Sequence, residues 1–178
     1  MSNYSPLRYP GGKSSLYPVI SGVIKSNKLK HSIYIEPFAG GASIAWHLLL
    51  DGVVDYIIIN DADKAVYSFW RTVMESPQWL VEKIEATPIT VDEWRKQRDI
   101  LRGGKKYSKE LGFAMFYLNR TNRSGILDAG PIGGYSQSGE YKIDCRFNKE
   151  KLVKKIQQEK NQKDTEKNKK IDPKLEAI

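Results

Sequence analysis

Metal ligands and disulfide-forming residues are scarce in this sequence. Its 178 residues include one cysteine, Cys145, and two histidines, His31 and His47. A single cysteine excludes a disulfide framework and a cysteine metal cluster, and two histidines leave little for a histidine-rich site, so we expect no metal. No apolar run approaches the about 20 residues that span a bilayer, and the N-terminus carries no signal-peptide pattern. The sequence therefore predicts a cytoplasmic protein with no membrane partner.

The sequence does have the balance of a globular protein, together with an excess of positive charge. Charged residues make up 28% and apolar residues 40%, which excludes wholesale disorder. The formal net charge is +8. Either a solvated basic surface or a polyanionic partner such as nucleic acid explains this charge. Residues 151–178 hold nine lysines against five acidic residues, so a lysine-rich end alone does not establish nucleic-acid binding.

Strand-like and helix-like segments alternate in the first 75 residues. Residues 32–35 and 56–59 have the short apolar runs of buried strands, and helical spacing follows each run, at 42–50 and 62–74. This order indicates a βαβ unit with parallel strands and a right-handed crossover. A helix is also predicted at 13–24, with these apolar side chains on one face: Leu16, Ile20, Val23 and Ile24.

The alternation stops after this unit, and helices follow one another. Helical spacing predicts helices at 79–86, 91–101 and 109–119, and the glycines of 125–141 indicate a loop or hairpin. A last helix begins at Asn148 and loses its apolar pattern after Ile156. The large aromatic side chains on the helices are expected in the core: Trp46, Phe69, Trp70, Phe113 and Phe116.

A glycine-rich turn and an acidic residue follow the two predicted strands. The turn at 36–41 reads Glu-Pro-Phe-Ala-Gly-Gly, which would let the backbone approach a ligand but is equally a tight strand-to-helix turn. Asp61 ends the second strand, 21 residues after Gly40. A carboxylate at a spacing of about 20 binds the ribose hydroxyls of an adenosine-containing cofactor. Asp61 could instead cap the next helix, but the two features together favour a nucleoside cofactor.

The run Gly12-Lys13-Ser14 resembles the end of a phosphate-binding P-loop. That motif needs a glycine at position 7 and a preceding strand, whereas position 7 is Leu7 and no strand precedes it. The sequence therefore excludes a P-loop and leaves Lys13 for another role.

Four short elements occur in order along the chain: Tyr-Pro-Gly-Gly-Lys at 9–13, Glu-Pro-Phe-Ala-Gly-Gly at 36–41, Asn-Asp-Ala-Asp at 60–63 and Asn-Arg-Thr-Asn-Arg-Ser-Gly at 119–125. Together they resemble the D12 class of DNA adenine-N6 methyltransferases. The resemblance covers residues 6–150. It implies an α/β fold, with an incomplete Rossmann-like sheet of the S-adenosylmethionine-dependent methyltransferases and an inserted helical DNA-recognition region. It also implies methyl transfer from S-adenosyl-L-methionine to adenine N6 in double-stranded DNA.

The resemblance further implies a division of the chain and roles for single residues. We expect a cofactor-binding α/β part at 1–75, a helical and hairpin DNA-recognition region at 76–150, and a polar, lysine-rich tail at 151–178. The ring of Tyr9 would stack on or pack against the cofactor, and Lys13 would contact its methionine end. Asp61 would bind its ribose. The implied cofactor-binding set is Tyr9, Lys13, Glu36, Pro37, Phe38, Gly40 and Asp61.

The implied DNA-binding residues follow one another after the predicted helix at 109–119. They are Arg120, Asn122, Arg123 and Ser124. Arginine and asparagine side chains read guanine and adenine edges in the major groove. The alternative is a polar helix end with arginine near its C-terminus. Ser124 stands where many members of the family have asparagine, so the target sequence does not carry over.

The catalytic tetrapeptide of the family, Asp-Pro-Pro-Tyr, does not occur among the 178 residues. In the family its acid and a backbone carbonyl accept hydrogen bonds from the adenine amino group, and its tyrosine stacks on the flipped base. The one Asp-Pro, Asp172-Pro173, is followed by Lys174 in the polar tail. We therefore assign no catalytic residue and expect this chain to be inactive alone. A truncated gene, a split enzyme completed by a second chain, and a catalytically dead DNA- or nucleoside-binding module all fit.

Overall fold

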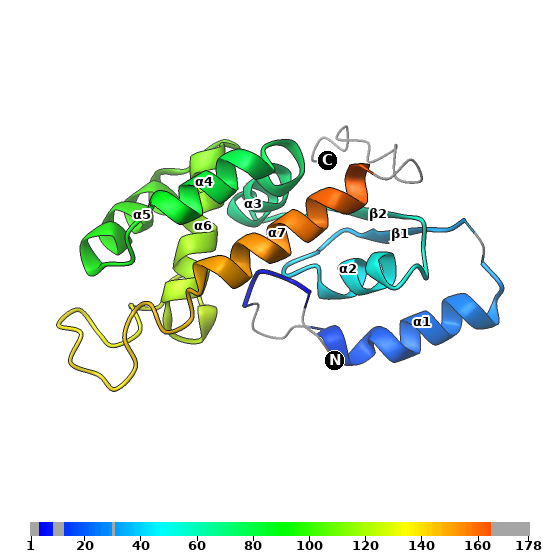
Figure 1. Cartoon of the computed structure of the whole chain (residues 1–178), viewed down its shortest axis with the longest axis horizontal. Coiled ribbons are helices and arrows are strands. Elements are labelled where there is room, and N and C mark those ends of the chain that lie inside the picture. The colour runs from blue at the N-terminus through cyan, green and yellow to red at the C-terminus, as the bar shows by residue number, and fades with distance from the viewer. Residues whose placement is uncertain (1–3, 9–12, 30, 165–178) are drawn as a thin grey trace.

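The structure of the protein, a computed structural model, describes residues 4–8, 13–29 and 31–164. In chain order its elements are the 3-10 helix η1 (Lys13–Leu16), α1 (Tyr17–Ser26), β1 (Ile33–Glu36), α2 (Ser43–Leu50), β2 (Tyr56–Ile59), α3 (Lys64–Glu75), α4 (Pro77–Ala86), α5 (Val91–Gly103), α6 (Lys109–Thr121), the 3-10 helix η2 (Arg123–Gly125) and α7 (Lys149–Asp164). Figure 1 shows α4, α5 and α6 gathered on one side and the two strands with α1 and α2 on the other, while α7 runs between them.

The two strands confirm the predicted βαβ unit. They pair in parallel, with Ile33 opposite Tyr56 and Glu36 opposite Ile59, and α2 connects them and packs on both. The described residues contain one sheet, and it has these two strands only. The fold is therefore a mixed one with a small parallel sheet. A Rossmann-like sheet needs more strands, so that finer expectation stays a prediction.

The two faces of this sheet differ in burial. Side chains alternate across a strand, and Glu36 and Ile57 on the face toward α2 are buried. On the other face, Ile33 and Ile35 are 55% and 57% exposed, because no described element packs over them. The prediction of a buried first strand is therefore right for one face and wrong for the other.

The predicted first helix forms as η1 followed by α1, but it buries a narrower stripe than expected. Ile20 and Ile24 pack against the core, whereas Leu16 and Val23 are exposed. A second contact fixes the helix to α2, because the ring of Tyr17 meets the buried His47 edge-on at 5.1 Å. The predicted apolar face is therefore buried only at Ile20 and Ile24, because α1 packs mainly against one helix of the described chain, α2.

The pair α3 and α6 forms the centre of the core. Gly112 allows the two helices to approach closely, because a Cβ there would lie 2.6 Å from the backbone oxygen of Ser68. Next to this contact, the rings of Phe69 and Phe116 stack with their centroids 5.4 Å apart. The core placement of the helical aromatics is confirmed, since all five predicted rings are buried: Trp46, Phe69, Trp70, Phe113 and Phe116.

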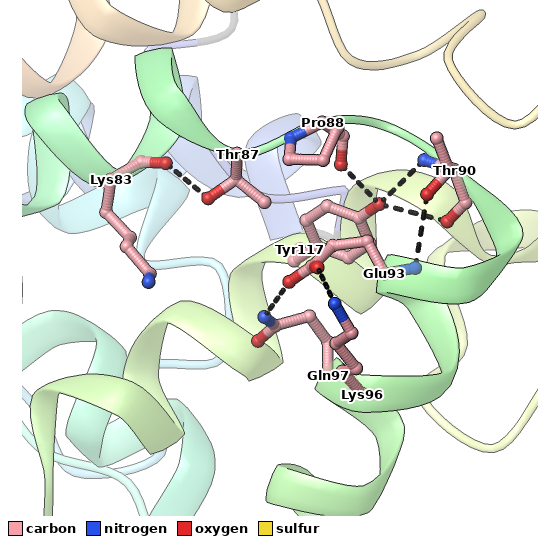
Figure 2. Close-up of polar contacts among 8 residues, drawn as sticks. All are labelled: Lys83, Thr87, Pro88, Thr90, Glu93, Lys96, Gln97 and Tyr117. Carbon is pink, nitrogen blue, oxygen red and sulfur yellow. Dashed lines mark hydrogen bonds and ion pairs between the residues drawn. The ribbon is translucent and has the colours of Figure 1, made fainter.

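A buried tyrosine of α6 holds the loop between α4 and α5 (Figure 2). The Tyr117 hydroxyl donates toward the backbone oxygens of Pro88 and Thr90, at 3.1 and 3.3 Å, and accepts from the Thr90 N–H at 3.3 Å. Burial raises the pKa of this phenol. Thr90 also caps α5, because its hydroxyl accepts the N–H of Glu93 at 3.1 Å. The three helices predicted after residue 75 are confirmed as α4, α5 and α6, and the bonds of Tyr117 join α6 to the loop between the other two.

The last helix extends further than predicted. It reaches Asp164, and its buried apolar side chains, among those the structure describes, are Leu152, Val153 and Ile156. The helix packs against α4 and α3, and α3 packs against α6. The hydrophobic core is therefore continuous across the two expected boundaries, after residue 75 and after residue 150. The three-part division stays a prediction. Within the described part of the chain, no helix has the length and apolarity to cross a membrane.

Candidate functional site

A cavity of about 290 Å³ lies at the carboxyl ends of β1 and β2. The carboxyl ends of parallel strands are where ligands bind in open α/β sheets. Five residues of the predicted cofactor set line it: Lys13, Glu36, Phe38, Gly40 and Asp61. Pro37 is exposed and is not among the lining residues. Tyr9 lies outside the described residues.

Asp61 joins the two loops that follow the strands. One carboxylate oxygen accepts the N–H of Gly40 at 2.8 Å, and the other accepts the N–H of Asp63 at 2.9 Å. The cap of α3 is Asp63, whose side chain accepts the N–H groups of Ala65 and Val66. The alternative of Asp61 as the helix cap is therefore wrong, and its carboxylate stays at the cavity wall.

The glycine-rich turn takes the form that a close backbone approach needs. Gly40 has a φ of +48°, which favours glycine, and its carbonyl accepts the indole N–H of Trp70 at 2.8 Å. The N–H of Ala39 donates to the carbonyl of Asn60 at 2.9 Å. These bonds hold the turn against α3 and the second strand, so the wall of the cavity is fixed from both sides.

A buried carboxylate and an exposed lysine face the cavity from opposite elements. Glu36 is 7% exposed, and its Oε2 atom is buried without a hydrogen-bond partner within the described residues. Burial raises its pKa, while the charge of Lys13 and a hydrogen bond from the backbone of Ala45 act in the opposite direction. A buried carboxylate with an open oxygen is a position for a positively charged or hydrogen-bond-donating ligand group.

Sequence reasoning missed one wall of the cavity. Ser5 and Leu7, from the segment before η1, also line it. Both are buried, and this segment is anchored far along the chain. Its Ser5 carbonyl accepts from the Lys155 ammonium of α7 at 3.0 Å. No local pattern in a short polar segment signals such contacts.

The predicted DNA-binding residues separate into buried and exposed ones. Asn122 is fully buried. Its amide accepts the indole N–H of Trp94 at 2.5 Å and donates to the carbonyls of Ile126 and Leu127 at 2.8 and 2.9 Å. These contacts use the side chain inside the protein and speak against direct contact with a base. We assign Asn122 to shaping the loop that follows α6.

Arg123 and Ser124 are exposed in η2, and Arg120 is half-buried in the last turn of α6. Ser124 has a φ of +55°, a conformation in which asparagine and glycine are more common than serine. The region beyond is a loop rather than a hairpin of strands, since its one bridge joins Asn122 to Pro131. The exposed arginine and serine therefore lie at the start of a turn-rich loop.

Comparison with known proteins identifies the group to which this chain belongs. A glycine turn and an acid at the ends of two parallel strands are also found at the nucleotide-binding sites of α/β folds. The family of D12 class N6 adenine-specific DNA methyltransferases matches residues 9–177, and the chain belongs to this family. It is also similar to a type II methyltransferase, M.MjaIII, of Methanocaldococcus jannaschii, with 25% identity over 160 residues. The match covers 82% of this chain and 55% of that relative, so the chain spans about half of the relative's length.

A metal site has no support in the described part of the chain. No group of three or more histidine, cysteine, aspartate or glutamate side chains there could hold an ion. Cys145 is a free, exposed thiol, and His47 lies buried between the rings of Tyr4 and Tyr17.

Proposed function

We propose that this chain binds S-adenosyl-L-methionine in the cavity and double-stranded DNA at the loop after α6, as part of an adenine-N6 DNA methyltransferase. The observation that carries the proposal is the meeting of Lys13, Glu36 and Asp61 around one cavity at the ends of two parallel strands. Methyltransferases of this family normally use this cofactor, and the family's reaction takes DNA as substrate. The small sheet would then be the first part of a Rossmann-like one.

The charges of the cavity fit the cofactor. Its methionine end carries an ammonium and a carboxylate, and the cavity offers a carboxylate on Glu36 and an ammonium on Lys13. The unpartnered Oε2 of Glu36 is the atom we assign to the ammonium group. Asp61 would accept ribose hydroxyls with the lone pairs that Gly40 and Asp63 leave open. The exposed ring of Phe38 and the ring of Tyr9 would contact the adenine.

When bound, the cofactor supplies a methyl group on a sulfonium centre. The residues of this chain hold and orient it, because catalysis of this kind rests on positioning of the two reactants. Arg123 and Ser124, exposed on η2, would contact the duplex, and Arg120 would support them. The buried Asn122 would fix the loop that presents them.

We propose that a further polypeptide part completes the site. The 178 residues contain no Asp-Pro-Pro-Tyr, and Ile33 and Ile35 leave an apolar sheet face open. Parallel sheets are normally covered on both faces. A second chain, or a longer form of this one, would add strands to the sheet, cover that face with helices and bring the residues that bind the adenine amino group.

The experiment is a transfer assay in two arms. The 178-residue chain is incubated with tritiated cofactor and adenine-containing duplex, alone and together with a polypeptide that corresponds to the unmatched part of the methanogen relative. We expect cofactor binding by the chain alone and methyl transfer only in the second arm. Cofactor and duplex binding without transfer in either arm would instead favour the catalytically dead binding module. Failure to bind the cofactor would contradict the proposal.

A further inference from the structure

Three arginines from distant parts of the sequence lie within electrostatic reach of one another. Arg8 belongs to the segment before η1, Arg120 to the last turn of α6, and Arg146 to the turn before α7. Arg8 and Arg146 both repel the charge of Arg120, and Arg146 repels Arg8. Burial, with this repulsion, lowers the pKa of Arg120 to about 10. We call these three residues the arginine cluster.

No acidic side chain neutralises the arginine cluster within the described residues. None of the three guanidinium groups forms an ion pair there. The Nε atom of Arg120 is buried and has no hydrogen-bond partner. Among the described residues the Arg8 guanidinium donates one long hydrogen bond, of 3.4 Å, from Nη1 to the carbonyl of Asn122. Partly buried cations that repel one another and lack an acidic partner are unfavourable, so such an arrangement favours the binding of an anion.

The fold holds this unfavourable cluster in place by bonds to the backbone. The Asn119 side chain accepts the N–H of Arg8 at 2.8 Å and donates to its carbonyl at 2.9 Å. Gly125 permits the same segment to come close, because a Cβ at that position would lie 2.4 Å from the Arg8 carbonyl oxygen. The backbone of Arg8 is therefore fixed beside the end of α6, which carries Arg120, before any ligand arrives, and this reduces the entropy lost on binding.

The position of the cluster links the cavity to the exposed loop. Leu7, one residue before Arg8, lines the cavity, and Arg123 and Ser124 follow Arg120 within one turn on the exposed side. Guanidinium groups match phosphate oxygens with paired, charge-assisted hydrogen bonds. We propose that Arg8, Arg120 and Arg146 form a site for one phosphodiester of the DNA backbone, between the cofactor cavity and the exposed loop.

This inference rests on the proposed function and changes one part of it. Arg120 was predicted to read base edges, but a half-buried guanidinium that two others repel is suited to a backbone phosphate, which positions DNA and carries no sequence information. Arg8 and Arg146 were not among the predicted DNA-binding residues. Base reading is then left to the exposed Arg123.

The test neutralises one phosphate at a time. A duplex with a single mismatched adenine fixes the register, because flipping is easiest at a mispaired base. Single methylphosphonates, which lack the charge, replace each phosphate around that adenine, and the affinity of the unmodified chain is measured by fluorescence anisotropy. We expect a loss of roughly tenfold at one position and small losses elsewhere.

The variant Arg146→Gln identifies the partner of that phosphate. Arg146 is exposed, so this substitution leaves the core intact, and the exposed Arg102→Gln serves as the matched control. We expect Arg146→Gln to lose a similar roughly tenfold on the unmodified duplex and to lose nothing more at the sensitive phosphate. Arg102→Gln should keep the full sensitivity. Equal sensitivity of Arg146→Gln and the unmodified chain at every position would overturn the proposal.

A second arm separates DNA from free phosphate. Inorganic phosphate, titrated into the chain without DNA, is followed by thermal denaturation of the unmodified chain and of Arg146→Gln. A stabilisation that Arg146→Gln loses, without any sensitive position on the duplex, would show a site for small phosphates and overturn the DNA assignment. The duplex scan needs no cofactor and no methyl transfer. A sensitive phosphate with no methyl transfer in the assay above would uphold this site while the proposed enzymatic function fails.

Discussion

The side chain of Asn119 and the backbone of Arg8 form a reciprocal pair of hydrogen bonds across 111 residues of sequence. The amide oxygen accepts the Arg8 N–H at 2.8 Å, and the amide nitrogen donates to the Arg8 carbonyl at 2.9 Å. The same nitrogen also donates to the carbonyl of Gly125 at 3.0 Å. One buried amide thus joins the segment that lines the cavity, the end of α6 and the turn that begins the exposed loop.

Replacing this amide should weaken both the fold and the cavity. In Asn119→Ala, three backbone groups lose their partner, and we expect the free energy of unfolding to fall by about 2–4 kcal/mol. Ser5 and Leu7 should lose their fixed position, so the affinity for S-adenosylmethionine should fall as well. Urea denaturation and calorimetry measure the two effects. The exposed Gln78→Ala should change stability by no more than about 0.5 kcal/mol, and unchanged cofactor affinity in folded Asn119→Ala would refute the link.

Asp61 and Asp63 offer a matched pair of acidic substitutions. Asp61→Ala should reduce cofactor affinity by roughly tenfold to a hundredfold, because hydrogen bonds from ribose hydroxyls to a carboxylate contribute about 1.5–3 kcal/mol. Asp63→Ala removes the cap of α3 and should cost about 1 kcal/mol of stability. Its side chain does not line the cavity, so its cofactor affinity should stay near that of the unmodified chain. Calorimetry that gives equal affinities for both variants would dismiss the ribose role.

Glu36 should make the stability of the free chain depend on pH. Burial raises the pKa of its carboxyl above the ordinary value, so the folded chain binds this proton more tightly than the unfolded chain does. The contribution of Glu36 to the free energy of unfolding is therefore full below the ordinary glutamate pKa and is lost as the pH rises through the raised one. Glu36→Gln should remove this slope and leave the free chain more stable than the unmodified one near neutral pH.

Urea denaturation from acid to neutral pH, without cofactor, measures this slope. The exposed Glu85→Gln of α4 is the control and should keep it. The same Glu36→Gln chain should bind S-adenosylmethionine more weakly, since it lacks the charge that faces the ammonium group. A variant that keeps the slope and binds the cofactor as tightly as the unmodified chain would remove Glu36 from the site.

Local patterns predicted the helices, and five of the residues singled out for the cofactor line one cavity, because these features depend on residues close in sequence. The turn at 36–41 and Asp61 follow two strands that pair side by side, so the cavity is a direct consequence of the βαβ unit. The burial of Asn122 was beyond such reasoning. Its partner Trp94 lies on another helix, and a polar residue after a helix is ordinarily expected at the surface.

The exposure of Ile33 and Ile35 in the first strand went unpredicted for a different reason. Ile33 and Ile35 have the composition of a doubly buried strand, and the sequence pattern assumes that something covers each face. In the described part of the chain nothing covers the second face. The arginine cluster escaped prediction for a related reason, because Arg8 reaches the end of α6, which carries Arg120, through the long-range contact with Asn119.

The lysine-rich tail and the loop arginine should contribute to DNA binding in different ways. Removing residues 165–178, the part of the lysine-rich tail that follows α7, deletes scattered charges that act through counterion release, so its effect should fade as salt is added. Arg123→Ala removes an exposed guanidinium at the start of the loop, and a base-edge contact there would be worth about 1–3 kcal/mol of discrimination. Its loss should therefore persist at high salt and should narrow the difference between preferred and random duplexes. Anisotropy titrations at several salt concentrations compare the two variants with Arg102→Ala. If the tail deletion abolishes binding at every salt concentration while Arg123→Ala binds normally, the loop is not the DNA reader and the tail is.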